Sequence, residues 1–198
     1  MKKVRKSIHE VILSALILFI IMSFASIDAN AYTLFTGKGI GNRPLTFYVY
    51  ESTPSMYITA LKAGISTWNN AGYGTMFTYG GTTGYVPPVN TPNGQNGVRT
   101  IALGVLADYA VTTDYYNTAT GIIQEADISV NSSHQYFVSL AGTGADLVSV
   151  FTHELGHALG LGEEKYNTEA TMYEGMPYNE TKKRTLDSDD LAGLDVLY

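Results

Sequence analysis

The segment FTHELGHALGLGE, residues 151–163, decides how the rest of the chain is interpreted. His153 and His157 are four residues apart, so on an α-helix their imidazoles lie on one face, one turn apart, and can bind one ion. Glu154 projects to the side, where its carboxylate could reach a water at the ion without being a ligand, as a general base must. An amphipathic surface helix can also carry this HExxH pattern by chance.

The residues that follow favour a metal site over chance. Gly160 comes three residues after His157, where a helix that ends and turns needs a residue that can adopt positive φ. The turn would send the chain back toward the ion, and Glu163 follows three residues later.

HELGHALGLGE resembles the metzincin signature HExxHxxGxxH and is most similar to the matrixin-like branch of these zinc metalloproteases. The family's third ligand is usually His and sometimes Asp, whereas this chain has Glu163 at that position. We expect zinc to be bound by His153, His157 and Glu163, because zinc accepts two imidazoles and a carboxylate in other hydrolases. Glu164 is the competing ligand, and a set of three imidazoles would have to recruit His134.

A second motif, Thr171-Met172-Tyr173, follows at a distance that suits the Met-turn of the family. The resemblance implies that Met172 lies under the zinc ligands as an apolar floor, and ordinary core packing is the alternative. By the same resemblance, residues 174–178 form the outer wall of the S1′ pocket. Tyr173, Pro177 and Tyr178 are therefore candidate substrate-binding residues, and aromatic loop packing is the alternative.

The chain opens with the pattern of an export signal. Four basic residues precede an apolar run over residues 11–24, and Ala29 and Ala31 supply the small residues of a cleavage site. We predict that residues 1–31 are a signal peptide and residues 32–198 the catalytic domain of a secreted, extracellular protein. A run of about fourteen residues is shorter than the ~20 needed to span a bilayer, so no stable membrane association is expected after cleavage.

Composition narrows the class of partner. Hydrophobic residues make up 45% and charged residues 15% of the chain, which is typical of one globular domain. Cleavage after Ala31 would remove four of 12 basic and two of 18 acidic residues and change the net charge from −6 to −8. This excess of acidic residues argues against nucleic acid as a partner. Without Cys, neither disulfides nor a cysteine switch are available. We expect a monomer.

Residue patterns predict strands over residues 45–51, 75–79 and 98–106, and a helix with Thr53 as N-cap, Pro54 first and its end near Gly72. Residues 80–97 are predicted to be a long loop. The resemblance implies an α+β, metzincin-like domain with a twisted, mostly parallel sheet. In it, residues 107–116 form the antiparallel edge strand above the cleft and residues 121–131 the strand before the zinc helix, where Asp127 is expected to be hydrogen-bonded.

Two further helices have clear N-terminal signals. Asp146 is predicted to cap a zinc helix that ends at Leu159. Asp187, with Asp190 three residues later, has the pattern of a capping box for a C-terminal helix, and residues 186 and 191 suit a hydrophobic staple. Residues 189–198 resemble the helix that closes matrixin catalytic domains.

The resemblance implies a secreted zinc endopeptidase with Glu154 as general base and a protein or peptide as substrate. Two alternatives remain open. One is a metzincin-like binding protein without turnover, which is supported by the presence of Glu163 where the family usually has His. The other is a zinc hydrolase of a non-peptide amide, such as a cell-wall linkage, on the same fold. Calcium is a second ion that the sequence leaves open.

Overall fold

A computed structural model describes residues 32–34, 38–85 and 90–198. The predicted signal peptide, residues 1–31, lies outside the described residues, as do residues 86–89 of the predicted loop. Within the described part of the chain, no helix combines the length and the apolar character needed to cross a membrane.

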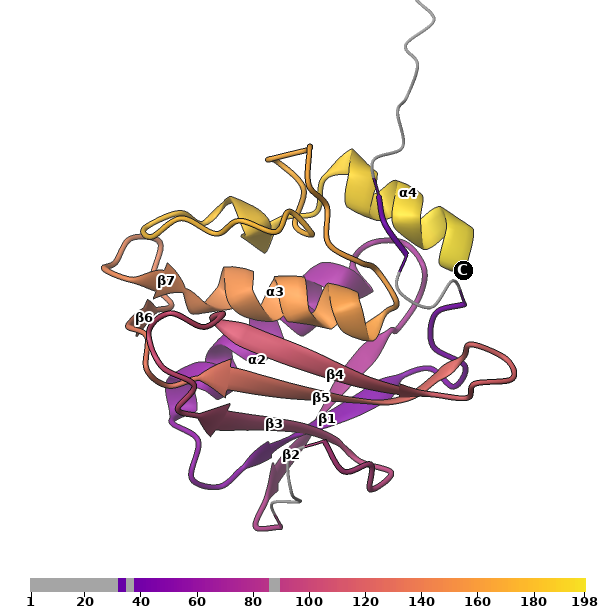
Figure 1. The fold of residues 1–198 in the computed structure, drawn as a ribbon, viewed down its shortest axis with the longest axis horizontal. Coiled ribbons are helices and arrows are strands. Elements are labelled where there is room, and N and C mark those ends of the chain that lie inside the picture. The colour runs from indigo at the N-terminus through magenta and orange to yellow at the C-terminus, as the bar shows by residue number, and fades with distance from the viewer. Residues whose placement is uncertain (1–31, 35–37, 86–89) are drawn as a thin grey trace, which may run out of the picture. The chain divides into compact units, whose positions relative to one another are not determined.

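A five-stranded sheet forms the base of the domain (Figure 1). Its strands are β1 (Leu45–Tyr50), β2 (Phe77–Thr83), β3 (Asn96–Ile101), β4 (Ala110–Tyr116) and β5 (Ile123–Asn131). They lie in the order β2-β1-β3-β5-β4, and all neighbours are parallel except β4, which runs antiparallel to β5 at one edge. The predicted mostly parallel sheet with an antiparallel edge strand is confirmed.

Helices α2 (Ser55–Asn69) and α3 (Leu147–Ala158) cover the same face of this sheet (Figure 1). Their buried sides and the sheet enclose one apolar core, in which Trp68, Phe151 and Leu155 are fully buried. The indole Nε1 of Trp68 also donates to the carbonyl of Thr152, 2.7 Å away, and so joins α2 to α3. The strands β6 (Tyr136–Phe137) and β7 (Ala145–Asp146) form a small separate pair just before α3.

The start of α2 differs from the prediction by one residue. Pro54 has φ −59° and ψ 146°, so its ψ is extended and Ser55 is the first helical residue. Pro54 therefore occupies the cap position, and no side chain caps this helix, because Thr53 lies one residue too early. The helix ends at Asn69, before Gly72.

The predicted loop over residues 80–97 is shorter than expected, because strands extend into it from both sides. β2 continues to Thr83 across a bulge, where Tyr48 pairs with Gly81 directly after Phe47 has paired with Tyr79. A Cβ at Gly80 would collide with the ring of Tyr48, so glycine is required for this close approach.

The prediction for residues 98–106 was wrong at its end. β3 stops at Ile101, and residues 102–108 form an exposed loop that leads into β4. Val105 and Leu106 in this loop are 68% and 101% exposed. Both line the pocket described below, so their apolar character belongs to a surface and not to a buried strand.

The predicted caps of the zinc helix and of the C-terminal helix, and the hydrogen bonding of Asp127, are confirmed. Asp146 accepts a hydrogen bond from the backbone N–H of Ser149 at the start of α3. The helix α4 (Ser188–Leu197) begins with a complete capping box between Asp187 and Asp190. The carboxylate of Asp127 accepts from the N–H of Gly97 at 2.8 Å and is buried in the sheet.

Candidate active site

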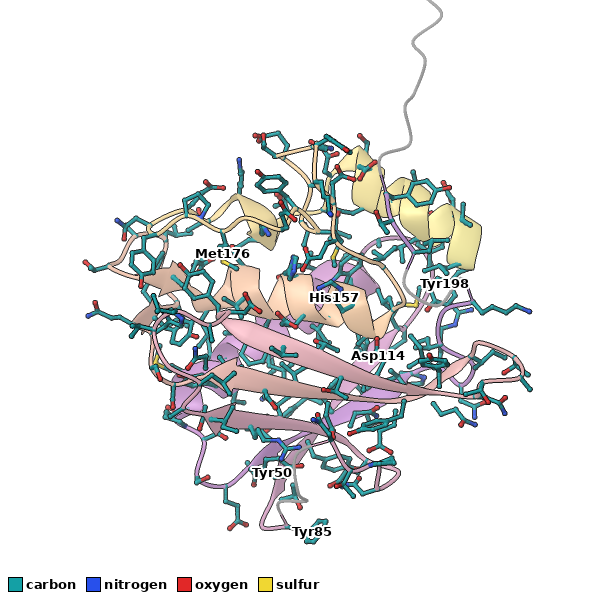
Figure 2. The ribbon with its side chains drawn as sticks, viewed as in Figure 1. Tyr50, Tyr85, Asp114, His157, Met176 and Tyr198 are labelled. Atoms are coloured by element: carbon teal, nitrogen blue, oxygen red, sulfur yellow. The ribbon has the colours of Figure 1, made fainter. Side chains whose placement is uncertain are left out.

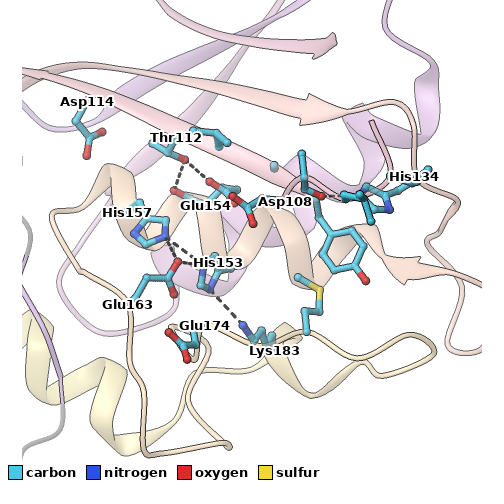
Figure 3. Close-up of a pocket in the computed structure, with 17 residues that line it drawn as sticks. Asp108, Thr112, Asp114, His134, His153, Glu154, His157, Glu163, Glu174 and Lys183 are labelled. Atoms are coloured by element: carbon cyan, nitrogen blue, oxygen red, sulfur yellow. Dashed lines mark hydrogen bonds and ion pairs between the residues drawn. The ribbon is translucent and has the colours of Figure 1, made fainter. Parts of the chain in front are cut away.

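Helix α3 places His153 and His157 on one face, and the backbone fixes the direction of both rings (Figure 3). The Nδ1 of His153 lies 2.8 Å from the carbonyl of Thr171, and the Nδ1 of His157 lies 2.9 Å from the carbonyl of Leu161. Because a carbonyl oxygen only accepts, each Nδ1 must donate. In the neutral rings the two Nε2 atoms therefore carry the lone pairs, and they face each other at 3.1 Å.

Glu163, and not Glu164, reaches this pair. The chain leaves α3 through Gly160, whose φ is 100°, as its position predicted. The backbone of Glu164 then pairs with the strand-like segment 172–174, and its side chain accepts hydrogen bonds from the N–H groups of Tyr166 and Asn167. Since successive residues of an extended segment point in opposite directions, the side chain of Glu163 turns toward the histidines.

The spacing of the three side chains fits a tetrahedral zinc ion. Zinc bonds of about 2.0–2.1 Å place neighbouring ligand atoms about 3.3–3.4 Å apart. Here an oxygen of Glu163 lies 3.4 Å from each Nε2, and the two Nε2 atoms are 3.1 Å apart. Three acceptors this close repel one another unless a cation or a proton lies among them. Among the described residues, this is the one group of three potential ligands that converges.

In the metal-free protein the cation is a proton on His157. Burial opposes the charge, but the hydrogen bond to Glu163 and the nearby charge of Glu154 outweigh it and raise the pKa of His157 to about 9. Burial would raise the pKa of Glu163, yet the hydrogen bonds from both histidines hold it well below its ordinary value. At neutral pH, His157 therefore carries one positive charge, which its hydrogen bond to Glu163 stabilises.

Glu154 lies beside the three converging side chains and is held by the edge strand. The hydroxyl of Thr112 on β4 donates to the carboxylate oxygen Oε2 of Glu154 at 2.6 Å (Figure 3). Glu154 is itself 5% exposed. Glu154 lines the pocket and Thr112 bonds to its Oε2, so Oε1 is the oxygen left to exchange a proton with a molecule in the site.

Met172 packs against α3 beside Gly156. Its Sδ atom occupies the space that a Cβ on Gly156 would need, and the residue is 3% exposed. The turn is held from α4, because the carboxylate of Asp190 accepts hydrogen bonds from the N–H groups of Thr171 at 2.8 Å and Met172 at 3.0 Å. The capping residue of α4 thus also positions the carbonyl that orients His153.

A pocket of about 480 Å³ opens over the three converging side chains, between β4 and the segment after Met172. Glu174 and Met176 line it, whereas the three residues predicted to bind substrate do not. Tyr178 is 54% exposed and packs its ring 6.0 Å from that of Tyr109, and Pro177 is exposed. The backbone carbonyl of Tyr173 accepts a hydrogen bond from Lys183.

Lys183 and Arg184, in the short 3₁₀ helix η1 (Lys182–Arg184), were not anticipated from the sequence. Lys183 is 2% exposed, lines the pocket and places its Nζ 3.4 Å from the Nδ1 of His153. Burial lowers the pKa of Lys183 to about 8, although the charge of Glu163 opposes this. Arg184 forms a two-point ion pair with Asp146, the cap of α3. A run of basic residues in a polar stretch carries no signal of burial.

His134 lies at the rim of the pocket and apart from the cluster. Its Nε2 is 2.9 Å from the carbonyl of Ala107, and its ring packs 4.6 Å from that of Tyr109. The three-imidazole alternative is therefore not assembled among the described residues.

The fold and this site together define a metzincin-like domain in which two histidines of the central helix converge with Glu163. The matrixin family model matches residues 108–198. Karilysin of Tannerella forsythia is 43% identical over 60 residues, which are 30% of this chain and 12% of karilysin. Rat matrilysin is 34% identical over 64 residues, 32% of this chain and 24% of matrilysin. The chain is therefore matrixin-like in the half that carries the site, and it spans a quarter or less of these relatives.

Proposed function

We propose that the protein is a secreted zinc-dependent endopeptidase, with His153, His157 and Glu163 as metal ligands and Glu154 as general base. The observation that carries this is the convergence of the three ligand atoms at tetrahedral spacing, with Glu154 held beside them. A purely structural zinc site has no use for an uncoordinated carboxylate. The position of Glu154 thus favours turnover over the alternative of a binding protein.

Each side chain then has a defined task. The carbonyls of Thr171 and Leu161 fix the two imidazoles, and Glu163 completes the ligand set. Zinc, when bound, supplies a Lewis acid that polarises the scissile carbonyl and acidifies a water. Glu154 accepts the proton of the attacking water at Oε1 and delivers it to the leaving amine, while Thr112 keeps Oε2 in place.

The substitution Glu154→Gln tests the assignment of the base, because it keeps the size of the side chain and the hydrogen bond to Thr112. We expect the variant to bind one zinc per chain, by elemental analysis, and to lose cleavage of casein and of a peptide library. Glu180→Gln is the matched control, since it removes one carboxylate outside the pocket. Cleavage by Glu154→Gln at the rate of the unsubstituted protein would assign the base elsewhere.

The class of substrate is tested by the same assays. Cleavage of casein that stops with a chelator and returns with zinc supports the endopeptidase. If only a non-peptide amide is hydrolysed, the alternative of a cell-wall hydrolase takes its place. For the location, we propose export with cleavage after Ala31, so N-terminal sequencing of protein from the medium should begin at Tyr32. An N-terminus still at Met1 would refute this.

A further inference from the structure

Asp114 is a carboxyl group of the pocket that the proposed mechanism does not use. It follows Thr112 by two residues on β4, so both side chains point to the same face of the strand. Asp114 lies at the end of the site beside His157 (Figures 2 and 3). Its Oδ1 is buried, and no hydrogen bond or ion pair from the described residues reaches it.

An unpaired carboxyl group in this place is a cost to the free protein. Burial removes water from Asp114, and this raises the pKa of its carboxyl group to about 7. The nearby His157 acts to lower this pKa, and the charge of Glu154 acts to raise it. A carboxylate that loses water without gaining a donor is destabilised. When such a group lies in a cleft, we expect a ligand to supply the missing hydrogen-bond or ion-pair partner.

The described lining residues offer Asp114 few basic partners. Asp108 and Glu174 are exposed acidic residues that also line it. Lys183 is the one lysine or arginine among the lining residues, and it lies beside His153 with its Nζ bonded to the carbonyl of Tyr173. No lysine or arginine is among the described lining residues at the end of the pocket beside Asp114, where His157 is the neighbouring basic group.

We propose that Asp114 determines specificity by pairing with a lysine or arginine side chain of the peptide substrate. This rests on the proposed peptidase function. A peptide that extends along the edge strand brings one side chain over the face that carries Thr112 and Asp114. These residues are about 7 Å apart along β4. The substrate residue that pairs with Asp114 therefore lies within about two positions of the scissile bond, which is held next to Glu154.

The test uses peptides that differ at one position, which carries lysine, norleucine or glutamate in turn, scanned over the positions flanking the cleaved bond. At pH 8 we expect one position at which lysine is favoured over norleucine by about tenfold in kcat/KM, as for a hydrogen bond to a charged group. Asp114→Asn should reduce this ratio to about one. Asp114→Lys should favour glutamate at the same position.

Binding provides a second readout that does not depend on turnover. In the Glu154→Gln background, fluorescent lysine peptides should bind about tenfold more tightly than norleucine peptides, and Asp114→Asn should remove the difference. Asp108→Asn is the matched control, because it removes the same charge from another part of the pocket and should keep the lysine preference. Thermal unfolding and zinc content establish that each variant is folded, and Asp114→Asn should be at least as stable as the unsubstituted protein.

The outcomes separate this inference from the peptidase function. If the unsubstituted protein cleaves no peptide, the proposed function fails. If it cleaves peptides without a lysine preference, or if the preference survives in Asp114→Asn, the peptidase stands and the role of Asp114 is refuted. A loss of zinc affinity in Asp114→Asn with an unchanged preference would also refute it, because Asp114 would then act on the metal site.

Discussion

Zinc binding to the metal-free protein should release about one proton at pH 7.5. The reason is the arrangement of three acceptors, which holds a proton on His157 and raises its pKa to about 9. Zinc binds the neutral imidazole, so proton and metal compete for the same Nε2. At pH 7.5 the imidazole is about 1.5 units below its pKa, and about 97% of the metal-free molecules carry the proton.

This competition fixes the sign and the slope of the pH dependence. Between pH 7 and about 9 the apparent zinc affinity should rise about tenfold for each pH unit, and it should level off above pH 9. Calorimetry in two buffers with different heats of ionisation counts the protons released, and competition with a chelator gives the affinity at each pH.

The control removes the cause of the raised pKa. In Glu163→Gln, His157 loses the hydrogen-bonded carboxylate that stabilises its charge, so proton release at pH 7.5 should fall well below one. If the unsubstituted protein releases no proton at pH 7.5, or if its zinc affinity does not change between pH 7 and 9, the three acceptors do not share a proton and the account of the site is wrong.

Three further predictions follow from the same contacts. Thr112→Val removes the 2.6 Å hydrogen bond to Glu154, a charge-assisted bond of about 1.5–3 kcal/mol, so kcat should fall about tenfold or more while zinc content, by elemental analysis, is unchanged. In Gly156→Ala the added methyl group would overlap the Sδ of Met172, and the overpacking cost of about 1–3 kcal/mol should exceed the gain in helix propensity of about 1 kcal/mol. Denaturant unfolding should show a net loss of stability that the additional substitution Met172→Ala partly restores. Greater stability of Gly156→Ala would contradict the packing. Because the folded pKa of His157 is raised, the metal-free protein should be fully stabilised by this group below pH ~6.5 and should lose that stability as pH rises through about 9, in thermal unfolding with chelator present.

The parts of the site that depend on local spacing could be predicted from the sequence. His153 and His157 are brought together by helix periodicity alone, and the positive φ of Gly160 follows from the need to end that helix and turn. Asp146 and Asp187 cap their helices through bonds to N–H groups two or three residues away. None of these features requires knowledge of distant parts of the chain.

The parts of the fold and of the site that depend on how distant segments pair or pack could not be predicted from the sequence. Thr112 reaches Glu154 only because β4 pairs with β5 in one register, which a single strand does not reveal. The largely apolar residues 102–106 resemble a continued strand, but no described strand pairs with them, and Val105 and Leu106 line the pocket instead. Likewise Lys183 is buried because η1 packs against α3, and its sequence neighbours give no sign of this.

The choice between Glu163 and Glu164 shows how the two kinds of information combine. Composition and spacing allow either carboxylate to approach the histidines. The backbone of Glu164 hydrogen-bonds to Met172 and Glu174, so the segment is extended there, and alternation sends only one of two adjacent side chains toward the histidines. The segment around Met172 therefore also has a role in orienting the side chains near the histidines. It fixes which side chain of this pair faces His153 and His157, and this is Glu163.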